Sequence, residues 1–181
     1  MVKTSSQMKN MVEDYFKNAG LKYIDSTEEM QKLNETIEWQ LVFGATHITK
    51  TKNRDDRLSL LNPLVFNQSS DIFNKLPNSE KIALITRIHE FIILKGMTFH
   101  WIPKKSKNEG ETKAKEPELE SLNVLTWIDE EELSRSNLFS KIDNLSGTVA
   151  IVRSLILQKI KPESVQDVTK SSEPPKGDYF Q

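Results

Sequence analysis

Apolar residues in the first segment of the chain recur every three or four positions, which is the spacing of an amphipathic helix. They are Met8, Met11, Val12, Tyr15, Phe16 and Ala19. Ser5 or Ser6 is suited to cap the start of this helix, and Gly20 is suited to end it. We therefore expect a surface helix that packs one face against a core.

A second helix is predicted between the start signal at Pro77-Asn78-Ser79 and the stop signal at Gly96. Its apolar residues form a wide arc and not a narrow stripe; they are Ile82, Leu84, Ile85, Ile88, Phe91, Ile92, Ile93 and Leu94. A helix with so wide an apolar arc is normally buried. We expect this helix to be the central one, covered by a sheet.

A third helix is predicted to begin near Ser134 and to end before Pro162. Its apolar stripe has a regular spacing and comprises Leu138, Ile142, Leu145, Val149, Val152 and Ile156. Gly147 lies inside this helix, where glycine costs about 1 kcal/mol relative to alanine. The sequence leaves open whether the helix breaks at that residue.

Between the helices the apolar period changes to two, which is typical of half-buried strands. The predicted strands cover Ile37–Phe43, Thr46–Lys52, Leu58–Phe66, Met97–Ile102 and Leu122–Ile128. Pro63 interrupts the third of them. Because proline cannot donate a ladder hydrogen bond, we expect a bulge or a sheet edge there.

These elements predict a single α+β domain over residues 5–161, in the order helix, three strands, helix, two strands, helix. We expect a five-stranded, mainly antiparallel sheet with the helices packed on one face. The predicted aromatic core comprises Trp39, Phe43, Phe99, Trp101 and Trp127. Residues 103–120 hold five lysines and five glutamates and almost nothing apolar, so we expect a disordered insert there, and a disordered tail over 162–181.

Composition narrows the class of protein. The chain of 181 residues has a formal net charge of −1 and no cysteine, which excludes disulfides and thiolate metal sites. Its start lacks the apolar core of a signal peptide, and no run of 18 apolar residues occurs. We expect a cytoplasmic protein that does not enter a membrane.

The order of elements resembles the type III secretion chaperone-like fold, which YbjN-like proteins and related uncharacterised archaeal families share. The resemblance covers roughly residues 5–160. The residues that carry it are the first predicted helix, the first predicted strand, the second helix with the strand after it, and the acidic segment before the last helix. These are Met8–Ala19, Trp39–Phe43, Ser79–Leu94 with Met97–Ile102, and Asp129–Ser134. It implies a twisted antiparallel sheet, frequent homodimers and grooves that bind segments of partner proteins. It implies no catalytic residues, and the insert at 103–120 departs from a compact hairpin.

Candidate chemistry is sparse. His47, His89 and His100 lie on different predicted elements and lack the spacing of metal ligands. No Gly-x-Ser-x-Gly motif occurs, and the six glycines are too scattered for a phosphate-binding loop. We therefore predict no enzymatic activity, no catalytic residue, no cofactor and no bound metal.

A basic stripe raises nucleic-acid binding as an alternative; it comprises Lys50, Lys52, Arg54 and Arg57. These cations near Trp39 are suited to phosphate contacts and base stacking. The competing interpretation is a solvated hairpin whose charge Asp55 and Asp56 offset. The overall charge also disfavours a dedicated nucleic-acid binder.

Protein binding is the function that the sequence favours. Leu155, Leu157 and Ile160 leave more apolar surface near the end of the last helix than one sheet face covers. Such a surplus is typical of a partner site or a dimer interface. Tyr179 and Phe180 in the tail are suited to act as a docking peptide. We expect a non-enzymatic protein-interaction or chaperone-like module whose partner is either a protein of unknown identity or a second copy of the chain. The alternative is a nucleic-acid-associated accessory protein.

Overall fold

The computed structural model of the chain describes residues 3–54, 56–65, 73–103 and 119–160. Its helices are α1 (Ser5–Asn18), α2 (Thr27–Leu33), α4 (Asn78–Leu94) and α5 (Arg135–Ile160), with a short 3-10 turn, η1, at Glu130–Glu132. Its strands are β1 (Ile24–Asp25), β2 (Ile37–Phe43), β3 (Thr46–Thr51), β4 (Arg57–Val65), β5 (Thr98–Pro103) and β6 (Leu119–Asp129).

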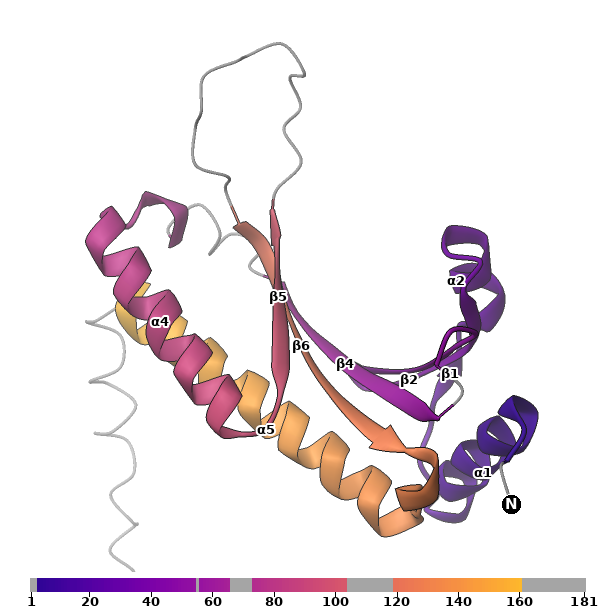
Figure 1. Ribbon diagram of the computed structural model, residues 1–181. Coiled ribbons are helices and arrows are strands. Elements are labelled where there is room, and N and C mark those ends of the chain that lie inside the picture. Colours follow the sequence, from indigo (N-terminus) through magenta and orange to yellow (C-terminus); the bar gives the residue numbers. More distant parts are fainter. Residues whose placement is uncertain (1–2, 55, 66–72, 104–118, 161–181) are drawn as a thin grey trace, which may run out of the picture.

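The strands form one antiparallel sheet in the order β1-β2-β3-β4-β6-β5 (Figure 1). The α+β class and the antiparallel sheet are as predicted, but the prediction of five strands was wrong. The additional strand, β1, pairs Ile24 with Val42 and Asp25 with Leu41. Two residues are too few to show the alternating pattern by which a strand is recognised in a sequence.

Helices α1, α4 and α5 lie on one face of the curved sheet, whereas α2 packs on β2 from the other face (Figure 1). The aromatic contact between Phe16 of α1 and Phe139 of α5, with ring centroids 5.6 Å apart, joins two of the three long helices. On the opposite face, Gln31 of α2 donates to the carbonyl of Glu38. The expectation of helices on a single face therefore holds for the long helices only.

The ends of the helices follow local capping chemistry. Thr4, and not Ser5 or Ser6, caps α1, because its side chain accepts from the backbone N–H of Gln7 and the Gln7 side chain accepts from the N–H of Thr4. This reciprocal pair is a capping box, which satisfies two N–H groups at once. Gly20, with φ of +66°, follows the end of α1 as predicted.

Helix α5 continues without a break through Gly147. The backbone N–H of Asn137 donates to the Ser134 hydroxyl, which places the cap where the sequence predicted it. All six residues of the predicted apolar stripe are buried. A continuous row of buried contacts on both sides of Gly147 outweighs the modest preference of glycine for other conformations.

Pro63 lies in an unshifted register between β4 and β6, opposite Asn123, so no bulge interrupts that pairing. On the other side of β4, the pairs with β3 cover only Ser59 to Leu61. At Pro63 the strand is therefore paired on one side, which is the local edge in which a strand proline is tolerated.

The core lies between the sheet and the three long helices. Trp39 is buried, and Phe43, Phe99 and Trp101 pack against the core from its margin, as predicted. Trp127 was wrongly assigned to the core. It stands opposite Ser59 on the other face of the sheet, because the residues from Leu122 to Ile128 alternate and the even-numbered ones are buried.

The predicted boundaries of the insert were also too wide. Pro103 belongs to β5, and Leu119 and Glu120 open β6. The amide of Asn74 holds Leu119 by donating to its carbonyl and accepting from its N–H, each over 3.1 Å. Residues 104–118 and the tail over 162–181 lie outside the described residues.

Candidate functional site

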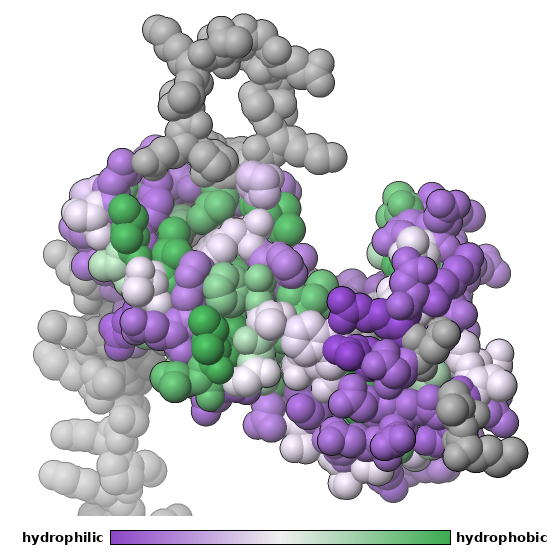
Figure 2. All heavy atoms as spheres, viewed as in Figure 1, coloured by the Kyte–Doolittle hydropathy of each residue, from purple (hydrophilic) through white to green (hydrophobic). Residues whose placement is uncertain are grey.

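Helix α4 carries a large exposed apolar surface. Its inner side chains, Leu84, Ile88 and Ile92, are buried in the core. On its outer side, Ile82 and Ile93 are each 63% exposed and Leu94 is 84% exposed. Figure 2 shows apolar side chains gathered over the region of α4. The prediction of a central, covered helix was wrong: α4 packs against α5 and the edge strand β5, and its second side is left open.

We define the α4 face as the exposed residues between Ile82 and Leu94, which are Ile82, Ala83, Thr86, Arg87, Glu90, Ile93 and Leu94. Sequence reasoning missed this surface, although the wide apolar arc was its signal. A wide apolar arc indicates that two sides of a helix are suited to burial. It does not show that other elements of the same chain bury both sides.

The apolar residues predicted near the end of α5 are only partly brought together. Leu155 is half-buried against the core, and Leu157 is 41% exposed. The side chain of Ile160, and the residues Tyr179 and Phe180, lie outside the described residues. The exposed apolar surface of the described chain is therefore larger on α4 than on α5.

The basic stripe does not form the surface that nucleic-acid binding requires. Lys50 is 1% exposed, because it lies on the covered face of β3 in line with Thr46 and Ile48. Its ammonium donates to the carbonyl of Arg54. Lys52 is exposed beyond the end of the strand. Lys50 is thus removed from any phosphate contact at the surface.

Arg57 forms ion pairs with acidic side chains next to it. Its guanidinium lies 3.2 Å from the Asp56 carboxylate and 4.0 Å from that of Asp129. The hydrogen bond from Arg57 lowers the pKa of Asp56, and the same bond raises the pKa of Arg57. Of the four predicted cations, only Lys52 and Arg54 are exposed.

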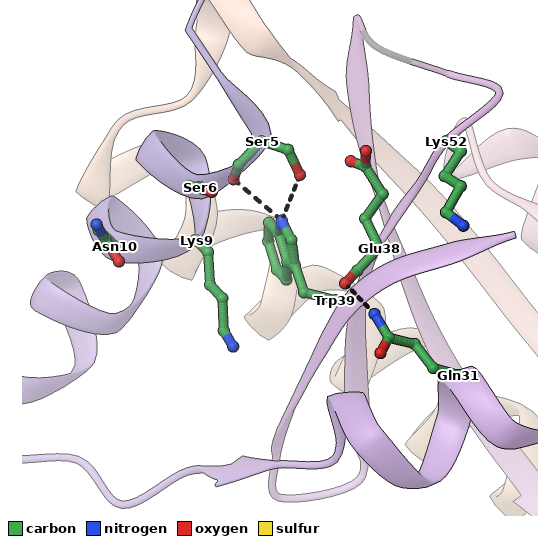
Figure 3. Close-up of a pocket in the computed structure, with 8 residues that line it drawn as sticks. All are labelled: Ser5, Ser6, Lys9, Asn10, Gln31, Glu38, Trp39 and Lys52. Carbon is green, nitrogen blue, oxygen red and sulfur yellow. Dashed lines mark hydrogen bonds between the residues drawn. The ribbon is translucent and has the colours of Figure 1, made fainter. Parts of the chain in front are cut away.

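A polar pocket of about 480 Å³ lies where α1 and α2 meet the first residues of β2 (Figure 3). It is lined by Ser5, Ser6, Lys9, Asn10, Gln31, Glu38, Trp39 and Lys52. The indole N–H of Trp39 donates to the carbonyl and the hydroxyl oxygen of Ser5, both at 3.1 Å. Lys9 forms an ion pair of 2.7 Å with Asp25, which ties α1 to β1.

Glu38 is the distinctive group of this pocket. Its Oε2 atom is buried and has no hydrogen-bond partner among the described residues. In Figure 3 the carboxylate stands between Ser5 and Lys52, while the Lys9 side chain points away. The pocket offers an acceptor and cations, but in the described chain no serine or threonine hydroxyl is hydrogen-bonded to a histidine or carboxylate side chain, as a nucleophile would require.

The face of the sheet opposite the core carries half-buried residues from β3, β4 and β6. In two cross-strand rows, His47 pairs with Leu61 and Leu61 with Leu125, while Thr49 pairs with Ser59 and Ser59 with Trp127. Figure 2 shows the molecule hollowed on this side, between α2 and the region of β5. The surface is mixed in polarity, with uncharged polar groups beside apolar ones.

A small polar network borders this hollow. The Gln40 side chain lies 2.9 Å from the Ser26 hydroxyl and donates to that of Thr49 over 2.8 Å. His47 Nδ1 lies 3.4 Å from the Gln40 oxygen, and burial lowers the pKa of His47. The contacts of Gln40 fix α2 on the sheet, and burial favours the neutral form of the His47 imidazole.

His89 connects α4 to the edge strand β5. Its Nε2 atom accepts from the indole N–H of Trp101 over 2.7 Å, and its ring stacks on Phe99 with centroids 4.0 Å apart. Because Nε2 is the acceptor, the neutral imidazole carries its proton on Nδ1. Burial lowers the pKa of His89, which favours the same neutral form.

Within the described ranges, no three histidine or acidic side chains gather closely enough to hold a metal ion. In the same part of the chain, no helix combines the length and apolar character needed to cross a bilayer.

No protein-family model and no curated protein matches this chain. Its fold is similar to that of an uncharacterised protein from Methanothermobacter thermautotrophicus, known from a crystal structure. The two share 15% sequence identity at a TM-score of 0.68, over 84% of this chain and 99% of the archaeal one. At this identity the similarity shows the fold alone.

Proposed function

We propose that this protein is a non-enzymatic protein-interaction module that binds another polypeptide through the α4 face. The observation that carries the proposal is the exposure of Ile82, Ile93 and Leu94 on one side of a helix. Several large apolar side chains exposed on one helix are typical of interaction sites in soluble proteins. The chaperone-like character of the module rests only on the resemblance in the order of elements.

The geometry of the other surfaces favours this function over nucleic-acid binding. Burial of Lys50 and the ion pairs of Arg57 leave few free cations along the basic stripe. Non-specific affinity for nucleic acid comes from phosphate neutralisation, which needs such cations at the surface. The α4 face requires no rearrangement to meet a partner, because its side chains are already exposed.

Site-specific photo-crosslinking in cells that produce the chain tests this function. A photoreactive residue replaces Ala83, a small exposed position on α4, and, as the matched control, Asp14, an exposed position on α1. We expect a discrete cross-linked species from position 83 that is absent from position 14. No cross-linked species from position 83 would overturn the proposed function.

A further inference from the structure

The exposed residues of α4 between Ile82 and Leu94 fall into two rows along the helix. Ala83, Arg87, Glu90 and Leu94 follow a 4-3-4 spacing, so they line up as one central row. Ile82, Thr86 and Ile93 form a second row on one side of it. The pattern is that of a helix that packs against another helix, with a single charged pair in its centre.

This pattern complements itself when the helix meets an antiparallel copy. A two-fold axis midway between Ile88 and His89 places Ala83 opposite Leu94 of the second copy, and Leu94 opposite Ala83. A small side chain then faces a large one at both ends of the central row. Interfaces of this kind are isologous, because the same patch serves both subunits.

The charges agree with the same axis. Arg87 of one copy faces Glu90 of the other, and the pair occurs twice because of the symmetry. If the two helices packed in parallel and in register, Arg87 of one copy would instead lie opposite Arg87 of the other. Antiparallel packing thus pairs opposite charges and avoids repulsion between like ones.

The second row of α4 adds apolar contact beside the central row. In an antiparallel pair related by a two-fold axis, the flanking rows of both helices lie on the same side of the interface. The axis brings Ile93 of one copy level with position 84 of the other, between Ile82 and Thr86, where it contacts Ile82. The two isoleucines, each 63% exposed in the single chain, are covered by this contact.

We infer that the occupant of the α4 face is a second copy of this chain, docked antiparallel through α4 about a two-fold axis near Ile88 and His89. The inference rests on the proposed function and names its partner. Complementary charge is the argument for a second copy: a face with one cation and one anion at symmetric positions fits itself.

Two single charge reversals test the inference by light scattering on purified full-length chains. Arg87→Glu gives α4 two acidic residues in the centre of the face, and Glu90→Arg gives it two basic ones. Either variant alone opposes like charges across the axis, and we expect a dissociation constant at least about tenfold higher than for the unaltered chain. An equimolar mixture of the two variants opposes unlike charges at both positions, so we expect dimers to return.

The mixture keeps every intrachain contact of the single variants, so restored assembly reports contact between chains. Dimers that do not return in the mixture, although the unaltered chain is dimeric, would overturn the antiparallel arrangement.

A second pair of variants tests the apolar contact. Leu94→Lys removes an 84% exposed side chain at the end of α4 and should abolish dimers. Leu33→Lys, which alters an 80% exposed leucine at the end of α2, is the matched control and should leave them intact. Both positions lie at a helix C-terminus, where lysine is tolerated. Equal behaviour of the two variants would overturn the inference.

Failure of the inference is distinguishable from failure of the proposed function. A monomeric unaltered chain that still cross-links from position 83 to a different protein, or to its own residues 161–181, overturns the dimer. If the cross-link is to a different protein, the proposed function stands. A cross-linked species with the mass of two chains supports both.

Discussion

Lys50 places a positive charge on the covered face of the sheet, and its ammonium reaches the carbonyl of Arg54. The aliphatic stem of this lysine lies opposite Trp39 on the neighbouring strand, so the side chain contributes packing as well as charge. A lysine in a β-rich segment is normally predicted to face solvent. Here the register of β3 overrides that expectation, because residues two apart share a face.

Replacing Lys50 by alanine should therefore act through the core. We expect Lys50→Ala to reduce the free energy of unfolding by about 2 kcal/mol, because it removes a buried stem and leaves a cavity. Lys52→Ala, at an exposed position two residues away, should change it by less than about 0.5 kcal/mol. Urea unfolding measures both. Equal effects at the two positions would show that Lys50 does not pack as described.

His89 couples α4 to β5 in a way that depends on pH. Its Nε2 atom accepts from Trp101, and a protonated ring cannot accept this bond. Burial keeps the pKa of His89 below its ordinary value, so as pH falls the unfolded chain takes up the proton first. The stability due to neutral His89 is complete above about pH 6.5 and is lost as the pH falls through the folded pKa.

We expect His89→Gln to flatten the decline of stability between pH 7 and pH 5, because glutamine accepts from Trp101 without titrating. His47, whose pKa burial also lowers, should maintain part of the decline. The measurement is urea unfolding across this pH range, and an unchanged slope in His89→Gln would contradict the account.

The helices differ in how well the buried face can be predicted from the sequence. In α5 a single stripe is apolar, so its buried face could be predicted from the spacing alone. In α4 the arc is so wide that spacing does not distinguish the side on the core from the side in solvent. Trp127 shows the same ambiguity in a strand: both faces of β6 carry apolar residues, and only pairing with β4 shows which is covered.

Gly147 leads to a prediction for α5. The helix is continuous at this residue, and an added Cβ atom meets nothing within 4 Å. Gly147→Ala should therefore stabilise the protein by about 0.5–1 kcal/mol, because alanine loses less backbone entropy in a helix.

Thermal or urea unfolding measures this gain, with Gly96→Ala as the comparison. Gly96 has a φ of +67°, a conformation that costs alanine about 1 kcal/mol, so that variant should be less stable than the unaltered chain. A less stable Gly147→Ala chain would mean that α5 bends at this residue.

At the scale of the molecule, the described residues form a six-stranded sheet with long helices on one face, and α4 lies toward the edge formed by β5 (Figure 1). The element order and most strands could be predicted, because each leaves a local pattern in the sequence. The exposed side of α4 could not, because it depends on how many elements one chain has available to cover a helix. The same limit explains why the apolar surplus was sought at Leu155, Leu157 and Ile160 and is larger on α4.

The most direct test of the central claim is the mass of the unaltered chain in solution, measured by multi-angle light scattering over a series of concentrations. If the α4 face binds a second copy, the mass should rise from the 20.8 kDa of one chain toward twice that value as the concentration increases. A mass that stays at 20.8 kDa at every concentration would contradict it.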